Sequence, residues 1–172
     1  AELEAWLAGQ PWREHALVVT ADVCVPASIE AAFARGAEHF GRVDVCVANA
    51  GAWPKPDQAL DQAPGERIRV AIEANLMGSL WTARAFLGAL RRAGPRPDGH
   101  GAALCFVGST AGRFGERGHA DYAAAKAGLV GLMLSLKNEI AEIDPFGRIN
   151  LVEPGWTVTH LVREELARPG AV

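Results

Sequence analysis

The sequence predicts an α/β protein with a doubly wound parallel sheet. Two observations favour this class. Short apolar runs typical of buried strands alternate with longer segments typical of helices, and such alternation implies a parallel sheet covered by helices on both faces. The 172 residues are 49 % hydrophobic, which is enough apolar material for a sizeable core, so we expect one domain over residues 1–172.

The first half of the chain contains two expected strands and two expected helices. Ala16–Ala21 and Val43–Ala48 are predicted strands because they are short and apolar. Ala27–Phe40 between them is a predicted helix, with a proline near its first turn. A loop rich in Pro, Asp and Gln follows over Trp53–Pro64, and a long helix is predicted from about Glu66 to Ala93.

The second half continues this alternation. Gly94–Gly101 contains several glycines and prolines and is a predicted loop. We expect a strand over Ala103–Val107, a helix over Tyr122–Ile143 and a strand over Ile149–Val152. No internal repeat or low-complexity tract interrupts the order.

Three polar residues suggest acid–base chemistry. Tyr122 is the only tyrosine of the sequence, and Lys126 lies four positions later in a predicted helix. Residues so spaced lie on one helix face about 5–6 Å apart. An ammonium beside a phenol favours the phenolate, so we expect the pKa of Tyr122 to fall from about 10 toward working pH. Ser109 follows an apolar run, which places its hydroxyl at the carboxyl end of a predicted strand, where open α/β sheets hold their chemistry.

At these residues the chain resembles the short-chain dehydrogenase/reductase family in its single-domain form, whose fold is Rossmann-like. The segment Gly108-Ser-Thr-Ala-Gly112, followed by Tyr122-xxx-Lys126, matches the family's serine and Tyr-xxx-Lys elements in spacing. Other segments resemble the family's fourth strand with its Asn-Ala-Gly turn, its helix asparagine, its sixth strand and its nicotinamide loop: Phe40–Gly51, Asn75 within Glu73–Gly78, Arg148–Asn150 and Pro154–Thr159. The resemblance runs from Ala1 to about Val162.

The resemblance implies an NAD(P)-dependent oxidoreductase that interconverts a secondary alcohol and a ketone by hydride transfer. Tyr122 would exchange a proton with the substrate oxygen, and Ser109 would polarise that oxygen. Lys126 would bind ribose hydroxyls and bias Tyr122 toward phenolate. Asn75 would support a proton relay through water; the alternative for an asparagine in mid-helix, where the residue is unfavourable, is a side chain that faces solvent.

The same resemblance implies a bound NAD or NADP. The expected contact residues are Asp22, Val23, Asn49, Ala50, Gly51, Tyr122, Lys126, Pro154, Gly155, Thr157 and Thr159. Three of these sites have alternatives. Asp22 also suits a turn before a helix, the Asn49–Gly51 turn also suits a purely structural role, and Pro154-Gly155 also suits a simple break between strand and loop. Five further loop residues either face the substrate or serve ordinary packing: Trp53, Phe114, His119, Trp156 and His160.

One element of a dinucleotide fold is not found in the sequence. Such a fold begins with a βαβ unit whose glycine-rich turn lets backbone amides approach the pyrophosphate, and no such turn occurs here. In the family's strand order 3-2-1-4-5-6-7, Ala16–Ala21 would be strand 3 and Val43–Ala48 strand 4, with Ala1–Gly9 as the helix after strand 2. We therefore expect strands 1, 2 and 7 to be missing from a dinucleotide-binding oxidoreductase domain that is truncated at both ends. The two flanking strands would be parallel but unpaired.

Composition argues against several other classes of protein. Net charge is −3 without a basic stripe, which argues against nucleic acid as a partner. No apolar run approaches the ~18–20 residues of a membrane span, and the acidic start is unlike a signal peptide. Cys24, Cys46 and Cys105 are an odd set in or beside predicted strands, which favours reduced core thiols in the cytoplasm and no metal site.

We expect a small-molecule alcohol or ketone as substrate and a homo-oligomer, a tetramer or a dimer, as the assembly. The family packs two long helices across two-fold axes, and Tyr122–Ile143 carries more apolar surface than one sheet face covers. The main alternative function is a non-catalytic dinucleotide-binding sensor or subunit partner on the same scaffold. An isomerase or dehydratase with the same Tyr-xxx-Lys chemistry is a third possibility.

Overall fold

A computed structural model describes residues 2–157, and within them three strands form one parallel sheet. The strands are β1 (Val45–Ala48), β2 (Ala103–Val107) and β3 (Arg148–Val152), in the spatial order β1-β2-β3. Ala48 pairs with Phe106, and Val107 pairs with Val152, so all three strands end at the same edge. This carboxyl edge is where an open parallel sheet presents its loops to a ligand.

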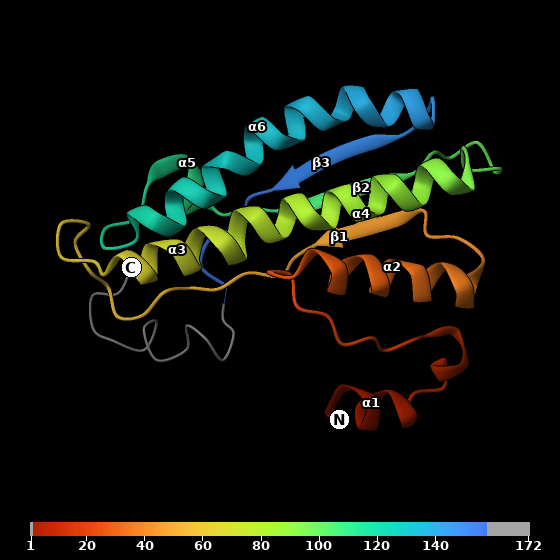
Figure 1. The fold of residues 1–172 in the computed structure, drawn as a ribbon, viewed down its shortest axis with the longest axis horizontal. Helices are drawn as coiled ribbons and strands as arrows, with labels where there is room; N and C mark the ends of the chain where they lie inside the picture. The colour runs from red at the N-terminus through yellow and green to blue at the C-terminus, as the bar shows by residue number, and fades with distance from the viewer. Residues whose placement is uncertain (1, 158–172) are drawn as a thin grey trace.

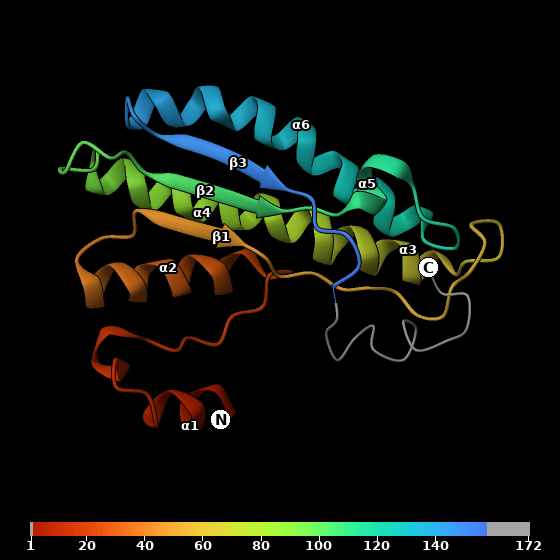
Figure 2. The same ribbon diagram turned by 180° about the vertical axis from the view of Figure 1, so that it is seen from behind.

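Helices α2 (Pro26–Phe40), α4 (Gly78–Ala93) and α6 (Ala120–Ile143) pack on one face of this sheet, which Figures 1 and 2 show from opposite sides. The core lies between these helices and the strands. Its fully buried large side chains come from α4, β2 and α6: Phe86, Leu90, Leu104, Phe106, Leu129 and Ile140.

The strands alternate their side chains between the two faces of the sheet. Leu104 and Phe106 of β2 are completely buried under the helices. Val45 and Val47 of β1 point to the opposite face and are 55 % and 60 % exposed. Among residues 2–157, therefore, helices cover one face of this sheet and leave apolar side chains on the other (Figure 2).

The long helix predicted from Glu66 to Ala93 is divided into three parts. It consists of α3 (Gly65–Ile72), the π-helical turn η2 (Glu73–Met77) and α4. A π turn inserts one extra residue and frequently marks a functional position in a helix. Asn75 lies at the centre of this turn.

Most other predicted elements are found with small shifts at their ends. The helix expected over residues 1–9 is α1 (Glu2–Ala8), and apart from Ala16–Ala21 the other predicted strands and helices match at their outer ends to within two residues. Two short helices were not predicted, namely the 3-10 turn η1 (Arg13–His15) and α5 (Thr110–Phe114). Both are too short to produce a periodic hydrophobic pattern.

The predicted strand at Ala16–Ala21 is wrong for this structure. Residues 16–22 run as extended chain between α1 and α2 without strand pairing (Figure 1). A strand needs a neighbour for its backbone hydrogen bonds, and the expected order places two other strands between this segment and β1. Among the described residues β1 pairs with β2 alone, so Ala16–Ala21 and β1 are unpaired with each other, as that order requires.

Candidate active site

The candidate site forms at the carboxyl edge of the sheet. Asn49 follows β1, Ser109 follows β2 after one residue, and Pro154 follows β3 after one residue. The segments that follow β2 and β3 are hydrogen-bonded to each other there, because the Thr110 N–H donates to the Pro154 carbonyl at 3.0 Å. Parallel strands thus bring together residues that are more than a hundred positions apart in sequence.

Ser109 is the N-cap of α5. Its Oγ accepts a hydrogen bond from the Ala111 N–H at 3.2 Å, and its backbone is extended, as a capping residue requires. A hydroxyl that accepts through its oxygen still has its own hydrogen to donate. Helix α5 packs directly against α6, which brings Ser109 to the face that carries Tyr122.

Tyr122 lies in the first turn of α6 and is partly buried. Burial raises the pKa of the Tyr122 phenol above its usual value, while a hydrogen bond with the Ser109 side chain opposes this and lowers it. The expected net fall in the pKa of Tyr122 is therefore wrong for this structure. The physical reason is desolvation of the phenolate, which outweighs the hydrogen bond.

Lys126 lies one turn further along α6 and is buried. Its Nζ is 5.6 Å from the centroid of the Tyr122 ring and donates to the Val107 carbonyl at 2.8 Å. Burial lowers the pKa of the Lys126 ammonium. The bond to Val107 uses one of three ammonium donors and leaves two for other groups.

Asn75 is buried and binds the loop that follows β1. Its Nδ2 donates to the Ala52 carbonyl at 2.8 Å, and its Oδ1 accepts from the Ala52 N–H at 3.1 Å. The alternative of a solvent-facing asparagine is therefore wrong. Its backbone carbonyl, within the π turn, accepts from the Ser79 hydroxyl at 3.1 Å.

Gly51 lies between Asn75 and Lys126. A Cβ atom at this position would be 2.5 Å from Asn75 Oδ1 and 3.4 Å from Lys126 Nζ. The first distance is shorter than non-bonded atoms tolerate, so the approach requires glycine. The turn after β1, the helix asparagine and the lysine therefore form one cluster.

Aromatic side chains surround Tyr122 on its other side. The Trp53 ring stacks on His119 with centroids 3.8 Å apart and meets the Tyr122 ring edge to face at 4.8 Å. Trp156 approaches Trp53 at 5.9 Å. The sequence left Trp53, His119 and Trp156 undecided because no spacing connects them, whereas Phe114 remains 79 % exposed.

Six other expected cofactor residues lie in two groups. Val23, Asn49 and Ala50 line a hollow of about 240 Å³ beside β1, with Gly78 of α4 packed against Val23. Pro154, Gly155 and Thr157 follow β3 at the same sheet edge, and the Thr157 hydroxyl donates to the Gly155 carbonyl at 3.2 Å. Thr159, like His160, lies outside the described residues.

Asp22 has a local structural role in this structure. Its Oδ1 accepts from the Cys24 N–H at 2.9 Å, and its own N–H donates to the Ser28 hydroxyl at 2.9 Å. These bonds form the turn that precedes α2. The alternative interpretation of Asp22 as a turn acid is thus supported, and its side chain is exposed.

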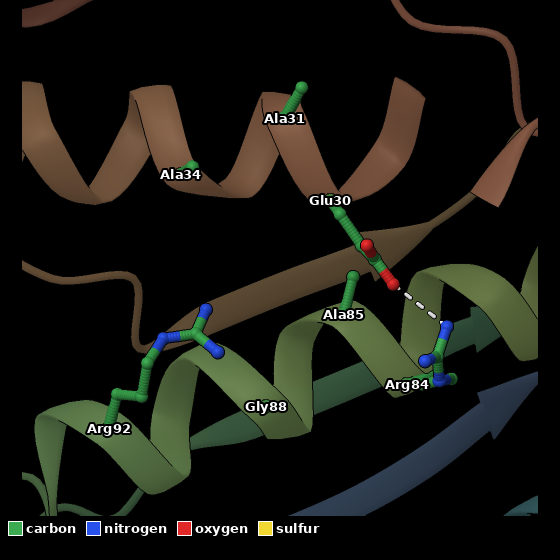
Figure 3. A pocket seen from close by; sticks show the side chains of 7 residues that line it. All are labelled: Glu30, Ala31, Ala34, Arg84, Ala85, Gly88 and Arg92. Carbon is green, nitrogen blue, oxygen red and sulfur yellow. Dashed lines mark hydrogen bonds and ion pairs between the residues drawn. The ribbon is translucent and has the colours of Figure 1, made fainter. Parts of the chain in front are cut away.

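A larger groove lies away from this chemistry. Between α2 and α4 it has a volume of about 520 Å³, and Glu30 reaches across it to Arg84 at 2.8 Å (Figure 3). None of the predicted site residues lines it. Over residues 2–157, moreover, no three His, Cys, Asp or Glu side chains are placed to hold a metal ion, and no helix has the length and apolarity to span a membrane.

Comparison with known proteins gives the family. The family model for short chain dehydrogenases matches residues 1–169. The chain belongs to the short-chain dehydrogenase family. This membership confirms the resemblance drawn from the Ser109, Tyr122 and Lys126 spacing, and with it the Rossmann-like α/β fold class.

Two curated relatives and one solved structure illustrate the match. The chain is 35 % identical over 142 residues to the 3-oxoacyl-[acyl-carrier-protein] reductase FabG of Escherichia coli. This aligned stretch covers 83 % of this chain and 54 % of the relative. It is 33 % identical to the reductase MabA of Mycobacterium avium, over 90 % of this chain and 57 % of the relative. A crystal structure classed with the short-chain dehydrogenase/reductases of Burkholderia xenovorans superposes with a TM-score of 0.73 at 29 % identity, over 87 % of this chain and 54 % of that one. The chain spans about half the length of the relatives it matches.

Proposed function

We propose that this chain carries the catalytic half of an NAD(P)-dependent oxidoreductase that interconverts a secondary alcohol and a ketone. The observation that supports this most is the cluster of Ser109, Tyr122 and Lys126 at the carboxyl edge of the sheet. The named relatives reduce a 3-oxoacyl group, which contains a ketone, and this supports the same class of carbonyl substrate.

Tyr122 is the proposed acid and base. A phenol holds its proton at neutral pH and can donate it to a carbonyl oxygen, and burial, which raises the pKa of Tyr122, keeps it in this protonated form in the structure described here. In the opposite direction the phenolate accepts the proton of an alcohol. The hydrogen bond from Ser109 favours the phenolate and therefore assists that direction.

Ser109 is the proposed donor to the substrate oxygen. Its Oγ accepts from the Ala111 N–H, and its one hydrogen, which is shared with the Tyr122 phenol in this structure, would turn to the substrate oxygen. A fixed donor beside an oxygen on which negative charge develops contributes about 2.7–4 kcal/mol in comparable sites. The cap of α5 uses a lone pair of the Ser109 oxygen, whereas the contact with the substrate oxygen would use the hydroxyl hydrogen.

We infer that several of the described residues would contact a bound dinucleotide. The hollow lined by Val23, Asn49 and Ala50 would hold part of it, and the two unused donors of Lys126 would bind its ribose hydroxyls. When bound, NAD or NADP supplies or accepts the hydride. Asn75 fixes Ala52 and so holds the loop after β1 in place beside Lys126, and we assign it a supporting role in proton relay.

The alternative is a dinucleotide-binding protein without turnover. Oxidation of NADH and NADPH by the complete protein, tested with a panel of aliphatic, cyclic and aromatic ketones, separates the two functions. The proposed function predicts ketone-dependent oxidation of at least one cofactor. Tight cofactor binding with no turnover on any ketone or alcohol of the panel would instead support the non-catalytic protein.

The remaining predictions concern the whole protein. We propose that residues 1–172 belong to a single dinucleotide-binding domain and that the protein is a homo-oligomer that associates through α6. On the outer face of that helix Val130 and Leu134 are 36 % and 47 % exposed, which supports an interface there. The expected cytoplasmic location and the choice between NAD and NADP stay predictions.

A further inference from the structure

A largely buried arginine connects three segments next to Tyr122. Arg67 of α3 donates from Nε to Asp121 Oδ2 at 3.0 Å and from Nη2 to the Gly118 carbonyl at 2.9 Å. Its Nη1 donates to the Pro56 carbonyl. The guanidinium therefore joins the loop after β1, the turn before α6 and the first turn of α6.

The ion pair of Arg67 with Asp121 is shielded from solvent. The two side chains are 11 % and 3 % exposed. The second oxygen of Asp121 accepts from the Tyr122 N–H at 2.9 Å. One carboxylate thus contacts both the guanidinium and the backbone of the candidate acid/base residue.

The loop and the turn that Arg67 joins are also in direct contact with each other. The Gln58 N–H donates to the Gly118 carbonyl at 3.1 Å. Gly118 has a φ of 80°, and a Cβ there would be 3.0 Å from Asp57 Cβ, so a side chain would be strained for both reasons. The same two segments carry Trp53 and His119, whose stacked rings border Tyr122.

A contribution to the stability of the fold is a poor explanation for the Arg67–Asp121 pair. Replacing a buried ion pair by apolar side chains is often neutral or stabilising, because both charges must be desolvated. The fork of an arginine, in contrast, fixes its acceptors in a defined geometry. Here all three acceptors of that fork belong to segments that surround Tyr122.

We propose that Arg67 is a positioning residue for Tyr122, acting through Asp121 and the Gly118 turn to hold the phenol within reach of Ser109. Only one part of this inference, the expected effect of Arg67 on kcat, rests on the proposed function. A displacement of about 1 Å in a reacting group costs on the order of 100-fold in rate. Loss of Arg67 is therefore expected to lower kcat by about 10- to 100-fold and to leave dinucleotide affinity unchanged.

The decisive test reads the position of the phenol without using activity. The protein is labelled with 3-fluorotyrosine, and the ¹⁹F resonance of Tyr122 is identified by its absence in Tyr122→Phe. Its titration midpoint is measured in wild type, Ser109→Ala, Arg67→Met/Asp121→Asn, and the variant that combines all three substitutions. The Arg67→Met/Asp121→Asn pair removes both charges together, so no unpaired buried carboxylate destabilises the fold or acts on the phenol.

The proposal predicts a non-additive result. Arg67→Met/Asp121→Asn should raise the titration midpoint of Tyr122 as Ser109→Ala does, and the triple variant should be no higher than Ser109→Ala. Arg69→Met is the matched control, since Arg69 lies on the same helix but is exposed and pairs with exposed Glu66, and it should change nothing.

Two results would overturn the inference. One is an unchanged midpoint in Arg67→Met/Asp121→Asn, and the other is a shift that adds to that of Ser109→Ala. Either one would leave the proposed function intact, because the readout does not depend on turnover. Conversely, a protein without turnover that shows the non-additive shift would retain the positioning role and lose the oxidoreductase function.

Discussion

Asn75 Oδ1 occupies the space in which a side chain on Gly51 would begin, at 2.5 Å from the position of its Cβ. The two residues come from different elements, the π turn η2 and the loop after β1. Asn75 also binds both the N–H and the carbonyl of Ala52. The contact therefore fixes the loop that leads to Trp53 against the π turn.

Gly51→Ala should disrupt this arrangement. The new methyl group would displace the Asn75 amide from Ala52, and overpacking of this kind costs about 1–3 kcal/mol. We expect a lower free energy of urea unfolding and weaker dinucleotide binding. Gly131→Ala is the control, because nothing lies within 4 Å of its Cβ position in α6, and it should stabilise the protein by about 0.5–1 kcal/mol. Equal stability of Gly51→Ala and wild type would contradict the close contact.

Lys126→Met should weaken dinucleotide binding as well as turnover. The substitution removes the proposed contacts with ribose hydroxyls, and hydrogen bonds to a charged group contribute about 1.5–3 kcal/mol each. Loss of two such bonds should raise the Kd for the dinucleotide, measured by quenching of tryptophan fluorescence, by at least about 100-fold. Lys137→Met on the exposed face of the same helix should bind like wild type. An unchanged Kd in Lys126→Met would exclude the ribose role.

Much of the fold was predictable from local patterns, and the exceptions have physical causes. The strand predicted at Ala103–Val107 matches β2 at both ends. This strand lies between β1 and β3, and its sequence is a continuous apolar run, as is typical of a buried parallel strand. The strand predicted at Ala16–Ala21 is just as apolar, but pairing depends on a neighbour that no local pattern describes. Helix α5 is a single turn, and its only sequence signal is the cap at Ser109.

The candidate site was predictable where one spacing connects its members. Tyr122 and Lys126 share a helix face, the apolar run before Ser109 placed it at the end of a strand, and the family resemblance added Asn75. Trp53, His119 and Arg67 belong to other elements, and only the tertiary structure shows that they meet beside Tyr122. The direction in which the pKa of Tyr122 shifts could not be predicted from the sequence either, because it depends on how deeply the phenol is buried.

Cys46 gives a pH dependence of stability with a defined sign. Burial raises the pKa of its thiol from 9.0 to about 11. The neutral thiol is thus favoured in the folded state, so its contribution to stability is complete below pH 9 and disappears as the pH rises toward about 11. The slope of unfolding free energy between pH 9 and 11 should be shallower in Cys46→Ala than in wild type, by urea titration. Identical slopes would show that Cys46 titrates normally.

The most direct measurement is the turnover and cofactor affinity of Tyr122→Phe in the complete protein. The substitution removes one hydroxyl and keeps the ring that packs against Trp53, so fold and dinucleotide Kd should remain those of wild type. General acid–base catalysis contributes about 10²- to 10⁴-fold, and we predict that kcat falls by at least about 100-fold. A kcat within a few-fold of wild type, at unchanged Kd, would contradict the assignment of Tyr122 as the acid/base residue.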